Sequence, residues 1–360
     1  MREIGGEFWN VPQVEKDNRI FPESTQWFLS GRSALQAIVR KLKGCHTVAM
    51  PSWCCDSMIR PFINAGLEVN FYPVYWKNGL VQEIQDNCDV LFLMDYFGYT
   101  GAQLDLSNYE GVVIRDITHS IFSTSYSDAD YYFGSLRKWC GVWTGGYAWT
   151  RDGREISVES RTDDLGYTVL REKAMQLKSD YIHGTADEYA HRTADKSYLG
   201  IFNEAEDVLE TVDVVHASNR DVQAAFKLDV EFIRTQRRKN AEILRNAFPE
   251  WLIFREMRDT DCPMFVPILV PDGKRNELRR YLINNEIYCP VHWPVSEYHK
   301  LNERAKTIYA NEISLVCDQR YTEEDMKRMV DTIKAFWLLN EDHIQVNKIE
   351  QGQNSCGKEA

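Results

Sequence analysis

The chain has 360 residues, of which 44% are hydrophobic and 12% aromatic, and its formal net charge at pH 7 is −12. This composition excludes a disordered protein and predicts a globular one of about two domains. The acidic balance argues against a nucleic-acid partner, because binding phosphates requires clustered Lys and Arg. Apolar runs are too short for a membrane helix, so no membrane partner is expected. Nine cysteines without a Cys-x-x-Cys pair, and a start without an apolar targeting segment, predict a cytoplasmic protein with reduced thiols and no metal site.

The first part of the chain predicts an arm followed by a capped helix. Residues 7–28 spread aromatic side chains among polar ones, which is typical of an arm packed on a larger body. Residues 34–42 follow helical spacing, and Ser30 or Ser33 can cap the helix start. Free backbone N–H groups at such a start can bind a phosphate, and an ordinary capped helix is the alternative.

Short apolar runs alternate with helical patterns over the next part of the chain. The runs are residues 47–50, 67–74, 89–95 and 111–116. This alternation predicts an α/β fold, with a mostly parallel sheet covered by helices. Ligands of such sheets bind at the carboxyl ends of the strands. Asp95, Asp116, His119 and the loop after Gly134 fall at such ends.

The pattern changes twice in the second half of the chain. Residues 151–250 are charged and helical in pattern, whereas those from about 251 alternate short strands with helices. We therefore expect a large domain with an N-terminal arm over 1–245 and a small α+β domain over 246–340. The polar residues 341–360 predict a disordered tail.

A lysine occupies an unusual position after an aromatic run. The run over residues 130–135 ends in Gly-Ser, Lys138 follows among bulky residues, and Gly145 and Gly146 open a second apolar run. This pattern indicates strand, tight loop and strand, with one amine held at the loop. Desolvation favours the neutral amine that forms an imine with a carbonyl, whereas a merely solvated lysine is the alternative.

Three features together indicate pyridoxal phosphate (PLP) as the cofactor. Asp116 ends a buried strand, Lys138 follows at the end of another, and the polar helix start lies upstream. A carboxylate keeps the pyridine nitrogen of PLP protonated, a lysine forms the imine, and a helix start neutralises the phosphate.

Several motifs also carry a resemblance to a known family. They are residues 28–35, 51–53, 116–120, 134–139, 145–146, 291–294 and 317–321. Their order and spacing resemble those of the DegT/DnrJ/EryC1/StrS family of sugar aminotransferases, over about residues 5–340. The resemblance implies the fold type I architecture of the aspartate aminotransferase superfamily.

Position by position, the resemblance implies roles for the residues around the lysine. Lys138 would bind the cofactor and, once free, move a proton during catalysis, and Asp116 would pair with the pyridine nitrogen. His119 would lie beside the phenolic oxygen of the cofactor. Arg32 and Ser33 would contact its phosphate, largely through backbone N–H groups.

The resemblance extends to four further positions. Ser135 would add a hydroxyl to the phosphate site. Trp53 would stack on the cofactor ring, although the register could place Cys55 there instead. His292 would lie near the substrate, or else simply pack beside its neighbours.

The implied reaction passes an amino group, from glutamate, to a keto-sugar linked to a nucleotide. A homodimer is expected, because family members often bind the phosphate with residues of the partner subunit. One alternative is a non-catalytic or regulatory protein that binds PLP or a sugar. Another is a PLP enzyme acting on a non-sugar acceptor.

Overall fold

A computed structural model gives the three-dimensional structure of the chain. It describes residues 3–84, 87–100, 106, 108–124, 128–156, 164–184, 196–301 and 303–355. None of the helices in these ranges combines the length and apolarity needed to cross a membrane.

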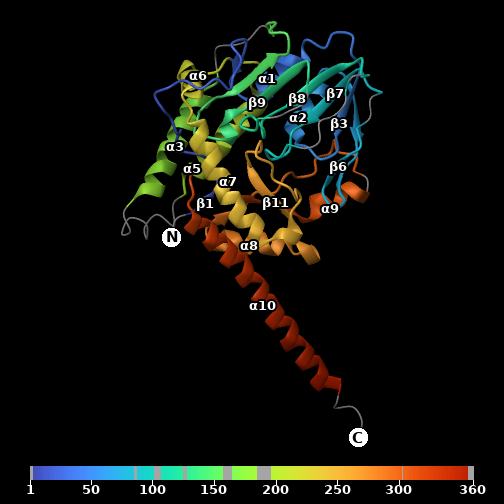
Figure 1. The fold of residues 1–360 in the computed structure, drawn as a ribbon, viewed down its shortest axis with the longest axis vertical. Coiled ribbons are helices and arrows are strands. Elements are labelled where there is room, and N and C mark those ends of the chain that lie inside the picture. Colours follow the sequence, from blue (N-terminus) through green and yellow to red (C-terminus); the bar gives the residue numbers. More distant parts are fainter. Residues whose placement is uncertain are drawn as a thin grey trace.

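Seven of the described strands form the central sheet, in the order β2-β10-β9-β8-β7-β3-β4 (Figure 1). They are β2 (Gln26–Phe28), β3 (Thr47–Pro51), β4 (Glu68–Tyr72), β7 (Val90–Met94), β8 (Val112–Asp116), β9 (Tyr131–Ser135) and β10 (Gly146–Thr150). The five strands from β9 to β4 run parallel, and β10 runs antiparallel to both of its neighbours. The predicted mostly parallel sheet is therefore confirmed.

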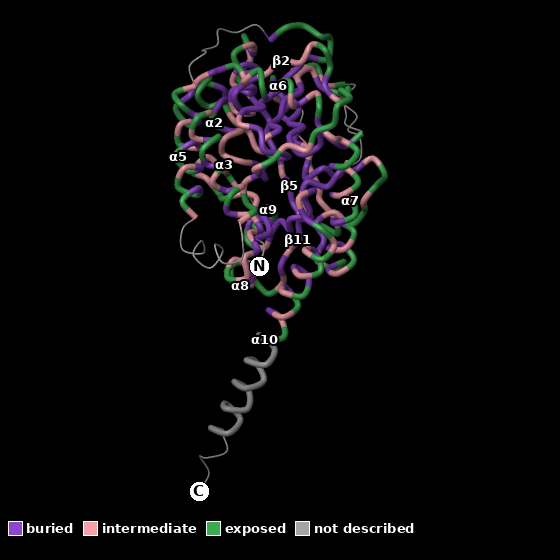
Figure 2. Tube along the Cα trace, turned by 90° about the vertical axis from the view of Figure 1, so that its left-hand side faces the viewer, coloured by how far each residue is buried: buried purple, intermediate pink, exposed green. Residues whose placement is uncertain are grey.

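The helices of this part cover the sheet and pack on one another. They are α1 (Gly31–Val39), α2 (Asp56–Asn64), α3 (Tyr167–His183), α5 (Tyr198–Thr211) and α6 (Asn219–Phe226). Helix α1 packs on β9, β10 and α2, while α3 packs along α5. A separate hairpin joins β5 (Val74–Trp76) to β6 (Leu80–Gln82). The buried interior continues from the sheet down to the strands of the second unit (Figure 2).

The second unit has its own hydrophobic core around a two-stranded sheet. Its elements are α7 (Val230–Ala247), η2 (Pro249–Trp251), β11 (Phe265–Leu269), η3 (Pro271–Gly273), α8 (Arg275–Asn284), β12 (Ile287–Tyr288), α9 (Glu303–Asn311), β13 (Glu312–Val316) and α10 (Glu323–Ser355). Strands β11 and β13 pair antiparallel, and α7 and α8 pack against α10. The boundary predicted at 245/246 falls within α7, and this division into domains stays a prediction.

The end of the chain was expected to form a disordered tail from 341, and this stays a prediction. Helix α10 continues to Ser355, and residues 356–360 lie outside the described part. No glycine or proline occurs between residues 323 and 351, so nothing in the sequence of this stretch stops the helix earlier.

The N-terminal arm is anchored to both units by a buried charge cluster. Strand β1 (Ile4–Gly5) pairs in parallel with β12. The Glu3 carboxylate, 2% exposed, lies 3.0 Å from the Lys178 amine and 3.2 Å from the Lys196 amine. Burial lowers the pKa of Lys178, and Glu3 opposes this shift. The ion pair with the buried Lys178 therefore anchors Glu3, and with it the arm.

Replacing Glu3 by Ala should lower the free energy of unfolding by about 3–5 kcal/mol, because it leaves the buried Lys178 without its carboxylate. Urea unfolding measures this change. The matched control is Glu323→Ala, which removes an exposed partner of Lys327 and should change stability by less than about 0.5 kcal/mol. Equal effects of both variants would contradict the anchoring role.

Candidate active site

A cavity of about 550 Å³ lies at the carboxyl ends of β8 and β9. Its wall also includes the start of α1, part of the arm, and segments of the second unit. The charged residues of the wall are Glu7, Arg32, Asp116, Arg137, Lys138, Glu206, Arg237, Arg279, Asp318 and Arg320. Cations outnumber carboxylates here, although the chain as a whole is acidic. The cavity therefore suits anionic groups.

Asp116 is a buried carboxylate at the last position of β8. Its side chain accepts hydrogen bonds from the backbone N–H and the hydroxyl of Thr118. The pKa of Asp116 is nevertheless raised to about 6, mainly by burial and in part by the nearby Asp95, while the Thr118 hydrogen bonds and Lys138 oppose the rise. Asp95 itself is paired with Arg115. Asp116 is thus an anion whose burial is only partly compensated, so it is suited to a cation on a ligand.

Lys138 follows β9 at the end of the short helix η1 (Leu136–Lys138). The buried side chains of Leu136 and Trp139 fix this turn on both sides of the lysine. Arg137 points into its own cluster, where it donates to Glu206 at 2.8 Å and to the hydroxyl of Tyr167. Lys138 is exposed and lines the cavity, so its amine is available to a ligand.

The start of α1 adjoins the end of β9. A Cβ on Gly31 would lie 3.2 Å from the Cβ of Ser135, so glycine permits this approach. The backbone N–H of Ser33 donates to the Ser30 hydroxyl at 3.1 Å. Among the described residues none accepts from the backbone N–H groups of Gly31 and Arg32. These two groups and the Ser135 side chain face the same cavity, which is an arrangement suited to an anion.

The side chains of Arg32 and Ser33 each bind a backbone carbonyl. The Arg32 guanidinium donates to the carbonyl of Leu209 at 2.8 Å. The Ser33 hydroxyl donates to the carbonyl of Asp213 at 3.2 Å, and Ser33 is not on the cavity wall. The expectation for Ser33 is therefore corrected, because its N–H and hydroxyl serve the helix cap and α1 packing.

His119 presents a defined ring nitrogen to the cavity. Its Nδ1 accepts from the backbone N–H of Phe97 at 3.2 Å, so the proton of the neutral ring is on Nε2. Burial, together with the charge of Lys138, lowers the pKa of His119 to about 3. The ring is therefore a neutral N–H donor that stacks on Trp293.

Trp53 does not reach the cavity, and this corrects its expected role as a ring-stacking residue. The side chain is fully buried, stacks on Tyr96 and donates from Nε1 to the carbonyl of His292 at 2.7 Å. Cys55, two residues later, lines the cavity instead. A place for Cys55 beside the cofactor ring stays a prediction.

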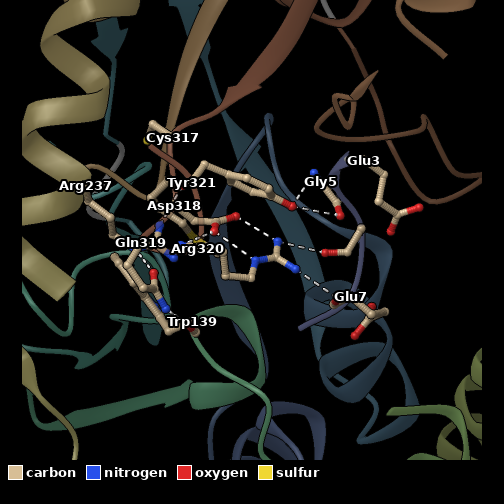
Figure 3. Close-up of polar contacts among 12 residues, drawn as sticks. Glu3, Gly5, Glu7, Trp139, Arg237, Cys317, Asp318, Gln319, Arg320 and Tyr321 are labelled. Carbon is tan, nitrogen blue, oxygen red and sulfur yellow. Dashed lines mark hydrogen bonds and ion pairs between the residues drawn. The ribbon is translucent and has the colours of Figure 1, made fainter. Parts of the chain in front are cut away.

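The far wall contains charged residues that the sequence did not single out for the site. Arg320 pairs with Asp318 at 2.8 Å and donates to the backbone carbonyls of Gly6 and Glu7 in the arm (Figure 3). Arg237, 1% exposed, donates to the side chain of Gln319 at 2.7 Å. Asp318 and Arg320 therefore form an ion pair on the wall of the cavity.

Arg237 and Glu7 had no sequence signal, because their partners are far away in the chain. Glu7 lies in the arm, yet it pairs with Arg171 of α3 at 3.0 Å. Burial opposes its ionisation, but the arginines around it and Lys138 hold the pKa of Glu7 at about 2. A charge pair between such distant segments is visible only in the fold.

The sequence matches no protein-family model and no curated protein. Solved structures do share its fold. PseC from Helicobacter pylori, an aminotransferase involved in the biosynthesis of pseudoaminic acid, is 13% identical, with 92% of this chain and 99% of that chain covered and a TM-score of 0.58. A DegT DnrJ EryC1 StrS aminotransferase from Brucella abortus is also 13% identical, with 87% and 85% covered and a TM-score of 0.57. The PLP form of Spr1654 from Streptococcus pneumoniae is 14% identical, with 86% of each chain covered and a TM-score of 0.57.

These likenesses rest on low identity and show the fold alone. The mostly parallel sheet and the match to these structures over most of the chain confirm the fold type I architecture expected from the sequence.

Replacing Asp116 by Asn should stabilise the ligand-free protein above pH 6, because it removes a poorly compensated buried charge. The pKa of Asp116 is about 6 in the folded state and 3.8 for the ordinary group, so the folded state binds the proton more tightly. This carboxyl's contribution to stability is fully present below pH 3.8 and is lost as the pH rises through 6. The gain in the variant should be roughly 1–3 kcal/mol at pH 8 and absent at pH 3.5.

Urea unfolding at the two pH values measures the difference. Asp95→Asn is the matched control, because it removes a carboxylate paired with Arg115 and should destabilise the protein at pH 8. If Asp116→Asn also destabilises the protein at pH 8, Asp116 is not the uncompensated anion described here.

Proposed function

We propose that this chain is a PLP-dependent aminotransferase similar to the DegT/DnrJ/EryC1/StrS sugar aminotransferases. One observation carries the proposal. The amine of Lys138, the carboxylate of Asp116 and the start of α1 share the wall of one cavity. PLP requires these three groups together, and the proteins of the same fold include a PLP form.

The residues of the cavity fit the cofactor. The buried Asp116, with its raised pKa, suits the pyridine nitrogen, since a cation there would relieve the cost of burying the carboxylate. The backbone N–H groups of Gly31 and Arg32 suit the phosphate, with the Ser135 hydroxyl beside them. When bound, PLP supplies the electron sink that makes loss of a proton from an amino substrate feasible.

The side chains then perform the proton transfers. Lys138 would take a proton from the Cα of the amino substrate and return it later in the reaction. Asp116 would pair with the pyridine nitrogen of PLP and keep it protonated. His119 would donate from Nε2 to an oxygen of the cofactor, which its neutral state permits.

The substrates we propose are glutamate as the amino donor and a nucleotide-linked keto-sugar as the acceptor. The sequence resemblance supports both. The excess of cations on the cavity wall supports substrates that carry carboxylate or phosphate groups. We also propose a cytoplasmic homodimer, as the resemblance implies, and sedimentation of the purified protein tests the dimer.

Lys138→Ala should abolish the visible absorbance of the bound cofactor and lower amino transfer by about 10⁴-fold or more, because no other amine replaces the lysine. Absorbance spectra with added PLP measure the first effect. Transfer from glutamate to a panel of nucleotide-linked keto-sugars measures the second.

Lys173→Ala is the control for this variant, because Lys173 is exposed on α3 and away from the cavity wall. It should leave both properties unchanged. If Lys138→Ala retains both, the assignment is wrong. Glutamate alone should convert the PLP form of the protein to the pyridoxamine form, and a protein that binds PLP without this change would be the non-catalytic alternative.

A further inference from the structure

A chain of hydrogen bonds in the second unit ends at the cavity. Glu312 and Ser314 are fully buried and lie on the same face of β13, two residues apart. The Ser314 hydroxyl lies 2.5 Å from Oε1 of Glu312 and 2.8 Å from Nδ1 of His292. The backbone N–H of His292 donates to Oε2 of Glu312 at 2.7 Å. The imidazole of His292 lines the cavity at the end of this chain.

His292 is poorly suited to keep a second proton on its ring. Burial lowers the pKa of His292 well below the ordinary value, and the neighbouring His119 and the charge of Lys138 add to this effect. A proton accepted at Nε2 must therefore be matched by loss of the proton at Nδ1. The hydroxyl of Ser314 is in position to receive it.

Glu312 can take the proton at the other end of the chain. Burial raises its pKa to about 8, while the bonds from Ser314 and His292 and the charge of Arg275 oppose the rise. Arg275 of α8 and the Cys289 thiol are the other charged or titratable groups near this carboxyl. A carboxyl of this kind changes its protonation near neutral pH, as an acid–base group requires.

His119 shows the opposite arrangement on the other side. Its ring centroid is 6.1 Å from that of His292, and its Nδ1 accepts from a backbone N–H. His119 is consequently fixed as a donor at Nε2. The Nδ1 of His292 instead faces a hydroxyl that can either accept or donate a proton.

We propose that His292, Ser314 and Glu312 form a proton relay for a substrate hydroxyl or ammonium group in the cavity, an inference that rests on the proposed function. The X–H bond of the substrate breaks and its proton moves to Nε2 of His292, leaving the electron pair on the substrate. The Nδ1 proton moves to the Ser314 hydroxyl, whose own proton moves to Oε1 of Glu312. One carboxylate becomes a carboxylic acid, no electrons are transferred, and the reverse steps return the proton.

Nuclear magnetic resonance of the ¹⁵N-histidine-labelled protein tests the relay directly, with the full chain measured with and without PLP. The chemical shifts of the two ring nitrogens report which one carries the proton, and loss of a signal in His292→Asn identifies the residue. We expect the neutral ring of His292 to change from Nε2–H to Nδ1–H as the pH rises through about 8. A ring that keeps one tautomer from pH 6 to 9.5 would overturn the relay.

Variants of Ser314 and Glu312 test whether these residues transfer protons or only hold His292 in place. Ser314→Ala and Glu312→Gln should each abolish the pH-dependent change of tautomer, and Ser314→Thr should restore it because the hydroxyl is kept. Ser314→Ala should lower kcat by roughly 10²-fold while PLP absorbance stays unchanged. A Ser314→Ala protein with the wild-type pH-dependent change would contradict the proposal.

The outcomes also distinguish this inference from the proposed function. If amino transfer and the loss of activity in Lys138→Ala are observed but the tautomer of His292 is fixed, the relay fails and the function stands. If the wild-type protein shows no amino transfer, the proposed function fails, and the titration of the tautomer still decides whether the relay exists.

Discussion

The carboxylate of Asp116 is the constraint on which the rest of the cavity depends. A buried anion costs free energy unless a cation or several donors lie against it, and here Thr118 supplies only part of that compensation. The fold tolerates this cost because the surrounding strands are fixed by their own ladders and by buried apolar side chains. The partly compensated carboxylate is therefore a suitable partner for a cationic group of a ligand. Functional sites commonly depart in this way from the arrangement that would be most stable.

The sheet topology gives this carboxylate its neighbours. Strands β8 and β9 are parallel and adjacent, so Asp116 and the lysine turn after Ser135 end at the same edge. Strand β10 turns back between β9 and β2, which brings the start of α1 to the same edge. A Cβ on Gly146 would lie 2.0 Å from the carbonyl oxygen of Ser30, so a larger residue there would push the helix away from the strand. One glycine thus maintains the approach of the start of α1 to β10, the strand that pairs with β2.

The sequence could predict the groups that strand ends and spacing position, but not those that long-range packing positions. Asp116 and Lys138 follow recognisable strands, and the topology of the sheet then places both at the cavity. Trp53 and Cys55 both lie in the loop between β3 and α2, where no periodic pattern tells which side chain points inward. The larger ring is buried in the core, and Cys55 lines the cavity. In the sequence Glu312 cannot be told from an exposed acidic residue. Its burial and its bond to the backbone of His292 become visible only in the fold.

The two ends of the chain complete the wall of the cavity. Arg320, close to the last helix, binds carbonyls of the arm and lies over the ring of Phe8, and Tyr321 accepts from the N–H of Gly5 at 2.7 Å. These contacts join segments that are more than 300 residues apart. The second unit also reaches the lysine side of the cavity, because the Gln319 side chain donates to the carbonyl of Trp139 at 2.6 Å and Arg237 lies over the Trp139 ring. The arm also binds the loop after Lys138, since the backbone N–H of Gly141 donates to the carbonyl of Asn10 at 2.8 Å. A change that loosens the arm would therefore disturb both sides of the cavity.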